Sequence, residues 1–305
     1  SLVRWGQCAD IPPGPAVVLT DGGLLVGEVT AADREFVSVE SSLFGTLRLP
    51  RPMVAGVLFH PPADRVNRDL LVDRILATAS DSDVAILRNG DELTGTVQRI
   101  AEGKVHLESL VGAVTLDNKG VGAIRYRPTV APSPDGPRAS QGLSACAGFA
   151  DGSRLMASAL SLAEDVLQIS VQGAKRWGAA PKEMVFLQPR GGQAVYLSDL
   201  KLEGYRHVSY LAMRWPFRSD RSVCGAMLRV DGRTYLKGLG MHSASRITFA
   251  LSEPYRRFQS ALAVDDLAEG GGSVAFRVFV DGQVRYSSPV IRGGQDPLPI
   301  SVDLA

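Results

Sequence analysis

Short runs rich in valine and leucine alternate with glycine- and proline-containing turns along most of the 305-residue chain. This alternation is typical of β-strands joined by tight turns. Residues 62–78 depart from it because they contain no glycine and their apolar residues recur at helical spacing. Those apolar residues are Val66, Leu70, Leu71 and Ile75. The pattern predicts an all-β protein with one amphipathic helix that begins near Ala63 or Asp64.

A unit of strand, tight turn and strand occurs three times before residue 192. Each copy turns at an Asp-Gly or Asn-Gly pair, whose glycine accepts positive φ at little cost, and these glycines are Gly22, Gly90 and Gly152. The copies resemble small SH3-like or Sm-like β-barrels. We expect the first barrel at 1–60, the helix at 61–80, the second barrel at 81–127, a Pro-rich linker at 128–142 and the third barrel at 143–192.

Residues 193–305 have longer alternating strands and more aromatic side chains. Hairpins are predicted at Asp231-Gly232 and Asp281-Gly282, each between runs in which apolar and polar residues alternate. The clustered aromatic residues are Tyr196, Tyr205, Tyr210, Trp215 and Phe217. This segment is long enough for a single antiparallel β-sandwich.

Two strings in this segment carry a family resemblance: YLKGLGMHSASRITFAL from Tyr235 and RRFQSALAVDDLAEGGGSVAFRVFVDGQVRYSSPVIRGG from Arg256. They are similar to the NPCBM family of carbohydrate-binding modules, which occur beside glycoside hydrolases. The resemblance implies a galactose-binding-like jelly roll that recognises sugars through loops at one end, often with a bound calcium ion. It implies nothing about residues 1–190 and names no sugar.

Sugar hydroxyls pair with carboxylates, arginine, histidine and amides, and the apolar face of a sugar ring stacks on an aromatic ring. The side chains of these types near the family strings are the candidate carbohydrate-binding residues: His242, Arg246, Asp265, Asp266, Trp215 and Lys237. Tyr210 is a second stacking candidate. If a structural calcium ion is present, Asp265 and Asp266 are its candidate ligands.

Each candidate also has a purely structural explanation. His242 follows Gly238-Leu239-Gly240, taken here as a turn, and can fix that turn by hydrogen bonding. The two aspartates can cap their own loop through backbone amides. Trp215 can be core packing, and Arg246 and Lys237 can be solvated charges on strand faces.

The remaining composition excludes several classes of function. The formal net charge is +1, and aromatic residues are not interleaved with Lys and Arg in the repeats, so we expect no nucleic-acid partner. No apolar run is long enough to span a membrane. The three cysteines, Cys8, Cys146 and Cys224, allow at most one disulfide and are interpreted as buried apolar residues. No zinc-binding spacing or known catalytic motif is present, so we expect no enzymatic activity.

These observations predict a non-catalytic carbohydrate-binding protein. The N-terminus has neither an initiator methionine nor a signal-peptide pattern, so any export signal would already have been removed. The family resemblance and this missing start together imply that the protein acts in the periplasm or outside the cell. Two alternatives remain open. One is a cell-envelope protein–protein scaffold without sugar binding, whose protein partner would bind the N-terminal barrels. The other is a weak glycoside hydrolase with a cleft between its domains.

Overall fold

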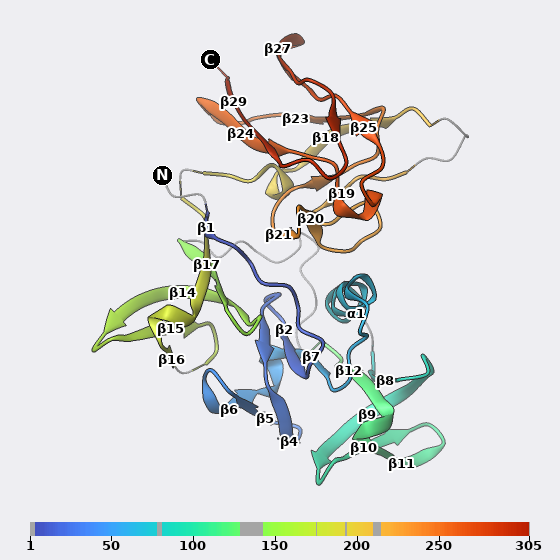
Figure 1. The fold of residues 1–305 in the computed structure, drawn as a ribbon. Helices are drawn as coiled ribbons and strands as arrows, with labels where there is room; N and C mark the ends of the chain where they lie inside the picture. The colour runs from blue at the N-terminus through green and yellow to red at the C-terminus, as the bar shows by residue number, and fades with distance from the viewer. Residues whose placement is uncertain are drawn as a thin grey trace. The chain divides into compact units, whose positions relative to one another are not determined.

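The computed structural model describes residues 4–77, 81–128, 143–174, 176–192, 194–209 and 215–304, so most of the predicted linker lies outside the described residues. The chain divides into two compact units, Ser1–Ala194 and Val195–Ala305. Strands build both units, and α1 (Arg65–Ala77) is the single α-helix of the described residues (Figure 1). The predicted all-β fold class is therefore confirmed.

The strands of the first unit follow one order three times after β1 (Trp5–Gly6). The first set is β2 (Ala16–Leu19), β3 (Leu24–Val26), β4 (Glu28–Ala32), β5 (Phe36–Ser41), β6 (Gly45–Pro50), the 3-10 turn η1 (Arg51–Met53) and β7 (Val54–Leu58). The second set is β8 (Asp83–Leu87), β9 (Glu92–Ala101), β10 (Lys104–Ser109), β11 (Gly112–Asp117), η2 (Asn118–Gly120) and β12 (Val121–Arg125). The third set is β13 (Ser144–Phe149), β14 (Arg154–Ala163), β15 (Val166–Val171), β16 (Trp177–Ala179), η3 (Pro181–Glu183) and β17 (Met184–Arg190). That each set is an SH3-like barrel remains an interpretation.

Together with β1, the three strand sets form one hydrogen-bonded network of 17 strands among the described residues. In each set the first strand pairs with the closing strand, as in β2–β7, β8–β12 and β13–β17. The pairs β7–β12, β4–β9 and β3–β14 then join the sets to one another. One hydrophobic core runs through all of them and includes Val57, Ile124 and Phe149, which have no exposed surface. The three sets are therefore parts of one packed body.

The helix lies against the sheet around β2 and β7. Asp64 caps its N-terminus, because the Asp64 carboxylate accepts the Asn67 N–H at 2.8 Å. Val72 and Ile75 face the second hydrophobic core, whereas Leu70, which the sequence pattern places on the apolar face, is 37% exposed. Arg68 is buried instead, and its guanidinium donates to the Ile11, Pro62 and Ala63 carbonyls. These bonds compensate the burial of a charged group on that face.

The second unit consists of antiparallel strand pairs. Its strands and short turns are η4 (Leu197–Asp199), β18 (Leu202–His207), β19 (Arg218–Ser219), β20 (Leu228–Val230), β21 (Arg233–Tyr235), β22 (Leu239–Gly240), β23 (Ser245–Phe249), β24 (Arg257–Leu262), η5 (Asp266–Ala268), β25 (Ser273–Val274), β26 (Arg277–Val280), β27 (Gln283–Ser287), β28 (Ile291–Arg292) and β29 (Leu298–Asp303). The pairs are β18–β23, β19–β22, β20–β21, β24–β29, β25–β28 and β26–β27. Leu262, Ile291, Ile300 and Val302 form the buried centre of this unit.

Both predicted hairpins of the second unit are present. Asp231 and Gly232 have φ of 52° and 68°, and Asp281 and Gly282 have φ of 50° and 80°, as a tight turn between twisted strands requires. The segment at Leu239 and Gly240 differs from the expectation. It is strand β22, paired with β19, rather than a turn. Gly240 is needed there because a Cβ atom would lie 2.2 Å from the Arg221 carbonyl oxygen.

Candidate functional site

Trp215 is fixed by its backbone while its side chain remains 44% exposed. The Trp215 N–H donates to Nδ1 of His207 at 3.2 Å, and the Trp215 carbonyl accepts the Tyr205 hydroxyl at 2.6 Å. His207 and Tyr205 alternate along β18, so both side chains lie on one face of that strand. Two bonds from one rigid strand therefore hold an exposed indole in place.

Ser245 and His242 complete this cluster from the next strand and the loop before it. β18 pairs with β23 so that His207 lies opposite Ser245, whose hydroxyl is 3.1 Å from that of Tyr205. Because Tyr205 donates its single proton to Trp215, Ser245 donates to Tyr205. The His242 ring lies 4.7 Å from the Trp215 ring and 6.1 Å from the His207 ring, measured between centroids. We call Tyr205, His207, Trp215, His242 and Ser245 the Trp215 cluster.

Two properties of His242 distinguish it from a residue that only fixes the chain. Its Nε2 is buried and has no hydrogen-bond partner within the described part of the chain. Burial and the nearby His207 both lower the pKa of His242, because each disfavours the imidazolium form. The ring is therefore neutral at pH 7, with an unused hydrogen-bonding nitrogen beside the indole.

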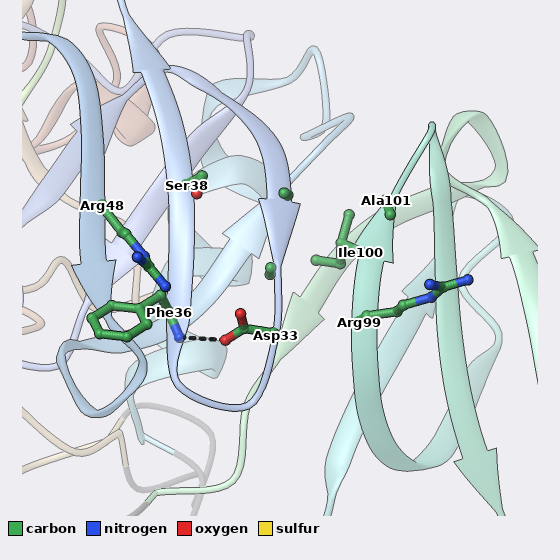
Figure 2. A pocket seen from close by; sticks show the side chains of 9 residues that line it. Asp33, Phe36, Ser38, Arg48, Arg99, Ile100 and Ala101 are labelled. Carbon is green, nitrogen blue, oxygen red and sulfur yellow. Dashed lines mark hydrogen bonds between the residues drawn. The ribbon is translucent and has the colours of Figure 1, made fainter.

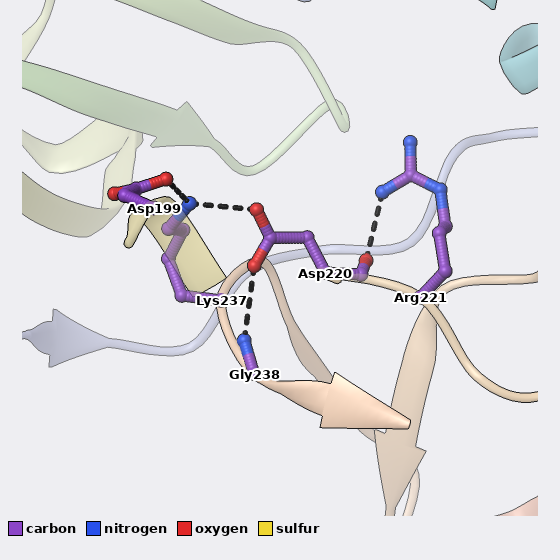
Figure 3. A network of polar contacts seen from close by, with 5 residues as sticks. All are labelled: Asp199, Asp220, Arg221, Lys237 and Gly238. Atoms are coloured by element: carbon purple, nitrogen blue, oxygen red, sulfur yellow. Dashed lines mark hydrogen bonds and ion pairs between the residues drawn. The ribbon is translucent and has the colours of Figure 1, made fainter. Parts of the chain in front are cut away.

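Lys237 lies in a different environment (Figure 3). Its side chain is almost fully buried, and its ammonium group contacts the carboxylates of Asp199 and Asp220, the latter at 2.6 Å. Asp220 also accepts the Gly238 N–H at 3.1 Å, which ties the ion pair to the start of β22. An ammonium group held by two carboxylates in this way stabilises the fold locally and has little capacity left for a ligand.

The carboxylates of Asp265 and Asp266 bind backbone amides. Asp265 accepts the Leu267 N–H at 3.0 Å and the Arg229 N–H at 3.2 Å. Asp266 accepts the N–H groups of Asp231 and Gly232, each at 2.9 Å, and so holds the turn between β20 and β21. Burial raises the pKa of Asp265, and these backbone bonds oppose the increase. A calcium ion at this pair would have to share these oxygens, and its binding stays a prediction.

Arg246 points away from the Trp215 cluster. It is opposite Arg206 in the β18–β23 register, whereas Ser245 and His207 form the adjacent pair, so Arg246 lies on the other face of the ribbon. Its guanidinium lies 5.0 Å from the centre of the Phe279 ring. Of the predicted binding residues, the structure thus brings together Trp215 and His242 and gives the other four different partners. Tyr210 lies outside the described residues.

A hollow in the first unit is a weaker candidate (Figure 2). It lies between the β4–β5 and β9–β10 hairpins and is lined by Asp33, Phe36, Arg48, Arg99 and their neighbours. The Arg48 guanidinium stacks on Phe36 at 3.9 Å, and the Asp33 carboxylate accepts the Phe36 and Glu35 N–H groups at 2.7 Å. These two backbone bonds lower the pKa of Asp33. Arg99 points away from Asp33 and Arg48 (Figure 2), so the charged side chains that line this hollow do not converge on one point.

Three members of the Trp215 cluster were not among the binding residues predicted from the sequence: Tyr205, His207 and Ser245. The alternation of Tyr205 and His207 was visible in the sequence, but their pairing with β23, some 40 residues later, was not. The cysteine interpretation also needs correction. All three cysteines are free thiols, and Cys224 is exposed rather than buried. Burial raises the pKa of Cys146 to about 11, so this thiol stays protonated and unreactive.

No group of three or more His, Cys, Asp or Glu side chains able to hold a metal ion occurs among the described residues. The helix that the structure describes is also too short and too polar to cross a membrane.

Comparison with known proteins identifies the second unit. Residues 193–305 match the model of the NPCBM/NEW2 domain family. These residues form an NPCBM/NEW2 domain. The strands and loops that build the Trp215 cluster all lie inside this NPCBM/NEW2 domain.

The chain is similar to two much longer proteins. The alpha-1,3-galactosidase B of Akkermansia muciniphila is 38% identical over 90 residues, which are 29% of this chain and 11% of that protein. A Renibacterium salmoninarum protein, provisionally named an endo-alpha-N-acetylgalactosaminidase, is 38% identical over 80 residues, which are 26% of this chain and 5% of that protein. The matched residues are thus a small part of each relative.

One solved structure with similarity contains CBM51-2 with GlcNAc and the INT domains from Clostridium perfringens ZmpB. It is 23% identical, covers 48% of this chain and 33% of that chain, and has a TM-score of 0.33.

Proposed function

We propose that the chain binds a carbohydrate through the Trp215 cluster of its NPCBM/NEW2 domain and catalyses no reaction there. The single observation that carries this proposal is the geometry of Trp215: an exposed indole held by two backbone hydrogen bonds beside His242. A sugar ring stacks on such an indole through its apolar face. Because the platform is held in place before binding, little conformational entropy is lost when the sugar binds.

The polar members of the cluster give the proposed site its hydrogen-bonding groups. The His242 ring lies beside the indole, and its Nε2 has no partner within the described ranges of the chain, so a ligand hydroxyl could satisfy it after a small rearrangement. Ser245 and Tyr205 lie at the base of the cluster. A histidine that only fixed a turn would use its nitrogens on that turn.

The sugar that we propose is a terminal α-linked galactose or N-acetylgalactosamine. The two relatives support this choice, since their names describe enzymes acting on α-galactosidic and α-N-acetylgalactosaminidic linkages. The galacto configuration also fits the geometry, because the axial hydroxyl leaves one face of the ring apolar for stacking. Glycans of this kind lie on cell surfaces and in secretions, so we propose that the protein acts outside the cytoplasm.

The chemistry of the cluster supports binding rather than hydrolysis. Glycoside hydrolysis needs two carboxyl groups on opposite sides of the bond to be cleaved. The five residues of the Trp215 cluster include no carboxylate. The scaffold alternative predicts that Trp215 is buried, and its 44% exposure favours sugar binding instead.

The proposal is tested with the full chain on a glycan array, followed by calorimetric titration with methyl α-galactoside and N-acetylgalactosamine. Trp215→Ala should weaken binding at least about tenfold, because exposed tryptophan anchors dominate binding energy. Phe279→Ala is the matched control, since Phe279 is an aromatic residue of similar exposure, 41%, outside the cluster. Circular dichroism checks that both variants are folded.

Three results would contradict the proposal: no glycan bound by the folded protein, equal binding by Trp215→Ala and the wild type, or equal losses in Trp215→Ala and Phe279→Ala. Binding to a different sugar class with the same dependence on Trp215 would support the site and reject only the choice of galactose.

A further inference from the structure

The first and third strand sets contact each other through equivalent turns, β5–β6 in the first set and β15–β16 in the third, which we call tips. Phe44, in the tip of the first set, packs against Phe149 and Trp177 of the third set, with ring centroids 5.2 Å and 5.6 Å apart. The tip of the third set in turn lies close to η1 of the first set. A Cβ atom added at Gly173 would lie only 3.2 Å from the sulfur of Met53. Each set therefore inserts its tip against the other.

This contact is organised around a local two-fold axis. Leu24 and Arg154 are the paired residues of β3 and β14, and each lies two positions after the turn glycine of its set, Gly22 or Gly152. Equivalent residues can pair with each other in an antiparallel arrangement only if the two sets are related by a two-fold rotation. Tip exchange between two strand sets is thus a symmetric contact that this chain already forms.

The second strand set has the same tip, and no other described residue of the first unit covers it. Leu110 and Val111, between β10 and β11, are 106% and 93% exposed. Leu87 and Val114 of the second set occupy the positions of Phe149 and Trp177. Leu87, like Phe149, lies three residues before the turn glycine, and Val114, like Trp177, lies four residues before the 3-10 turn. Both are only partly buried, whereas Phe149 and Trp177 are buried.

The opposite end of the strand network is already closed. The sets also associate through their closing strands, where Val57 of β7 pairs with Ile124 of β12. In the third set the equivalent residue is Leu187 of β17, and it pairs with Trp5 of β1. β1 thus occupies the edge that another strand set would use. The tip of the second set is the remaining open surface of this kind among the described residues.

We propose that two copies of this chain associate through the tips of their second strand sets, around a two-fold axis, with Leu110 and Val111 of each copy packed against Leu87 and Val114 of the other. The partner is a second copy of this chain, because the contact of this type within the chain is made between two equivalent strand sets. Because β1 closes the other end, the association stops at a dimer. The residue of the second set equivalent to Leu24 is Glu92, whose carboxylate binds Arg74 of α1. Pairing the two copies through this strand would place one Glu92 opposite the other, so the proposed contact does not include strand pairing.

Sedimentation velocity of the full chain over a concentration series tests the proposal. The wild type should show a reversible monomer–dimer equilibrium at concentrations of about 1–100 µM, the range of non-obligate dimers. The double variant Leu110→Ser, Val111→Ser should raise the dissociation constant at least about tenfold. Because both side chains are exposed in the single chain, this variant keeps its fold. Leu162→Ser is the control, since Leu162 is 63% exposed near the end of β14, outside the tips.

A dimer that is lost in the tip variant and kept in Leu162→Ser supports the proposal. A wild type that stays monomeric at about 100 µM overturns it, as does a dimer equally stable in the tip variant. A series of larger oligomers that grows with concentration would also overturn it, because that requires a contact without closure. Circular dichroism of each variant separates loss of association from loss of fold.

Discussion

The chemistry of the candidate site depends on which hydrogen-bonding groups of a few residues are already in use. The Asp265 and Asp266 carboxylates accept backbone amides, and the Lys237 ammonium group contacts the Asp199 and Asp220 carboxylates. Nε2 of His242, by contrast, is buried and has no hydrogen-bond partner among the residues that the structure describes. An unsatisfied buried nitrogen costs about 1–3 kcal/mol, and a hydrogen bond from a bound ligand would recover part of this cost.

The environment of His242 predicts how its ring titrates. Burial and His207 lower its pKa, so the folded protein holds this proton less tightly than the unfolded chain. The free energy of unfolding should therefore decrease as the pH falls below about 6.5 and be unaffected by this residue above it. An NMR titration should place the pKa of His242 below 6.5, and His207→Gln should raise it. Equal pKa values in the variant and the wild type would rule out the influence of His207.

Secondary-structure elements explain why only part of the site could be predicted from the sequence. The alternating runs and Asp-Gly turns revealed both hairpins, because turn chemistry and strand periodicity are local. His242 and Trp215 stood out by residue type. Their neighbours Tyr205 and His207 reach them only because β18 pairs with β23, and strand pairing over that distance leaves no local signal. Arg246 shows the same limit, since its face of the ribbon depends on register.

At the level of one element, Asp266 should stabilise the β20–β21 hairpin. Its carboxylate accepts both turn amides, so Asp266→Ala should lower the free energy of unfolding by about 1–3 kcal/mol. Chemical denaturation in EDTA and in calcium measures this loss. We expect the same loss in both solutions, because the substitution removes backbone hydrogen bonds. A loss seen only in calcium would show instead that the Asp265–Asp266 pair binds the ion.

At the scale of the whole chain, the sharing of strands in the first unit could not be anticipated from repeated sequence. A repeat tells which residues are equivalent, but not whether equivalent strands pair within a copy or between copies. The structure shows both, since β12 pairs with β8 of its own set and with β7 of another. Non-local pairing of this kind makes the stability of each set depend on its neighbours.

This dependence predicts that the three strand sets unfold together. Ile124 of β12 is fully buried and pairs with Val57 of β7, where the first and second strand sets meet. It belongs to the core that runs through all three sets. Ile124→Ala should lower the free energy of unfolding by about 2–5 kcal/mol. Hydrogen exchange should then lose protection in β13 and β14 of the third set as well as in β8 and β12, because the slowest amides exchange through one cooperative opening. The matched substitution Leu162→Ala, at an exposed position near the end of β14, should change neither. Unaltered protection of β13 and β14 in Ile124→Ala would mean that the third set folds independently, and each set would then be a separate folding unit despite the shared strands.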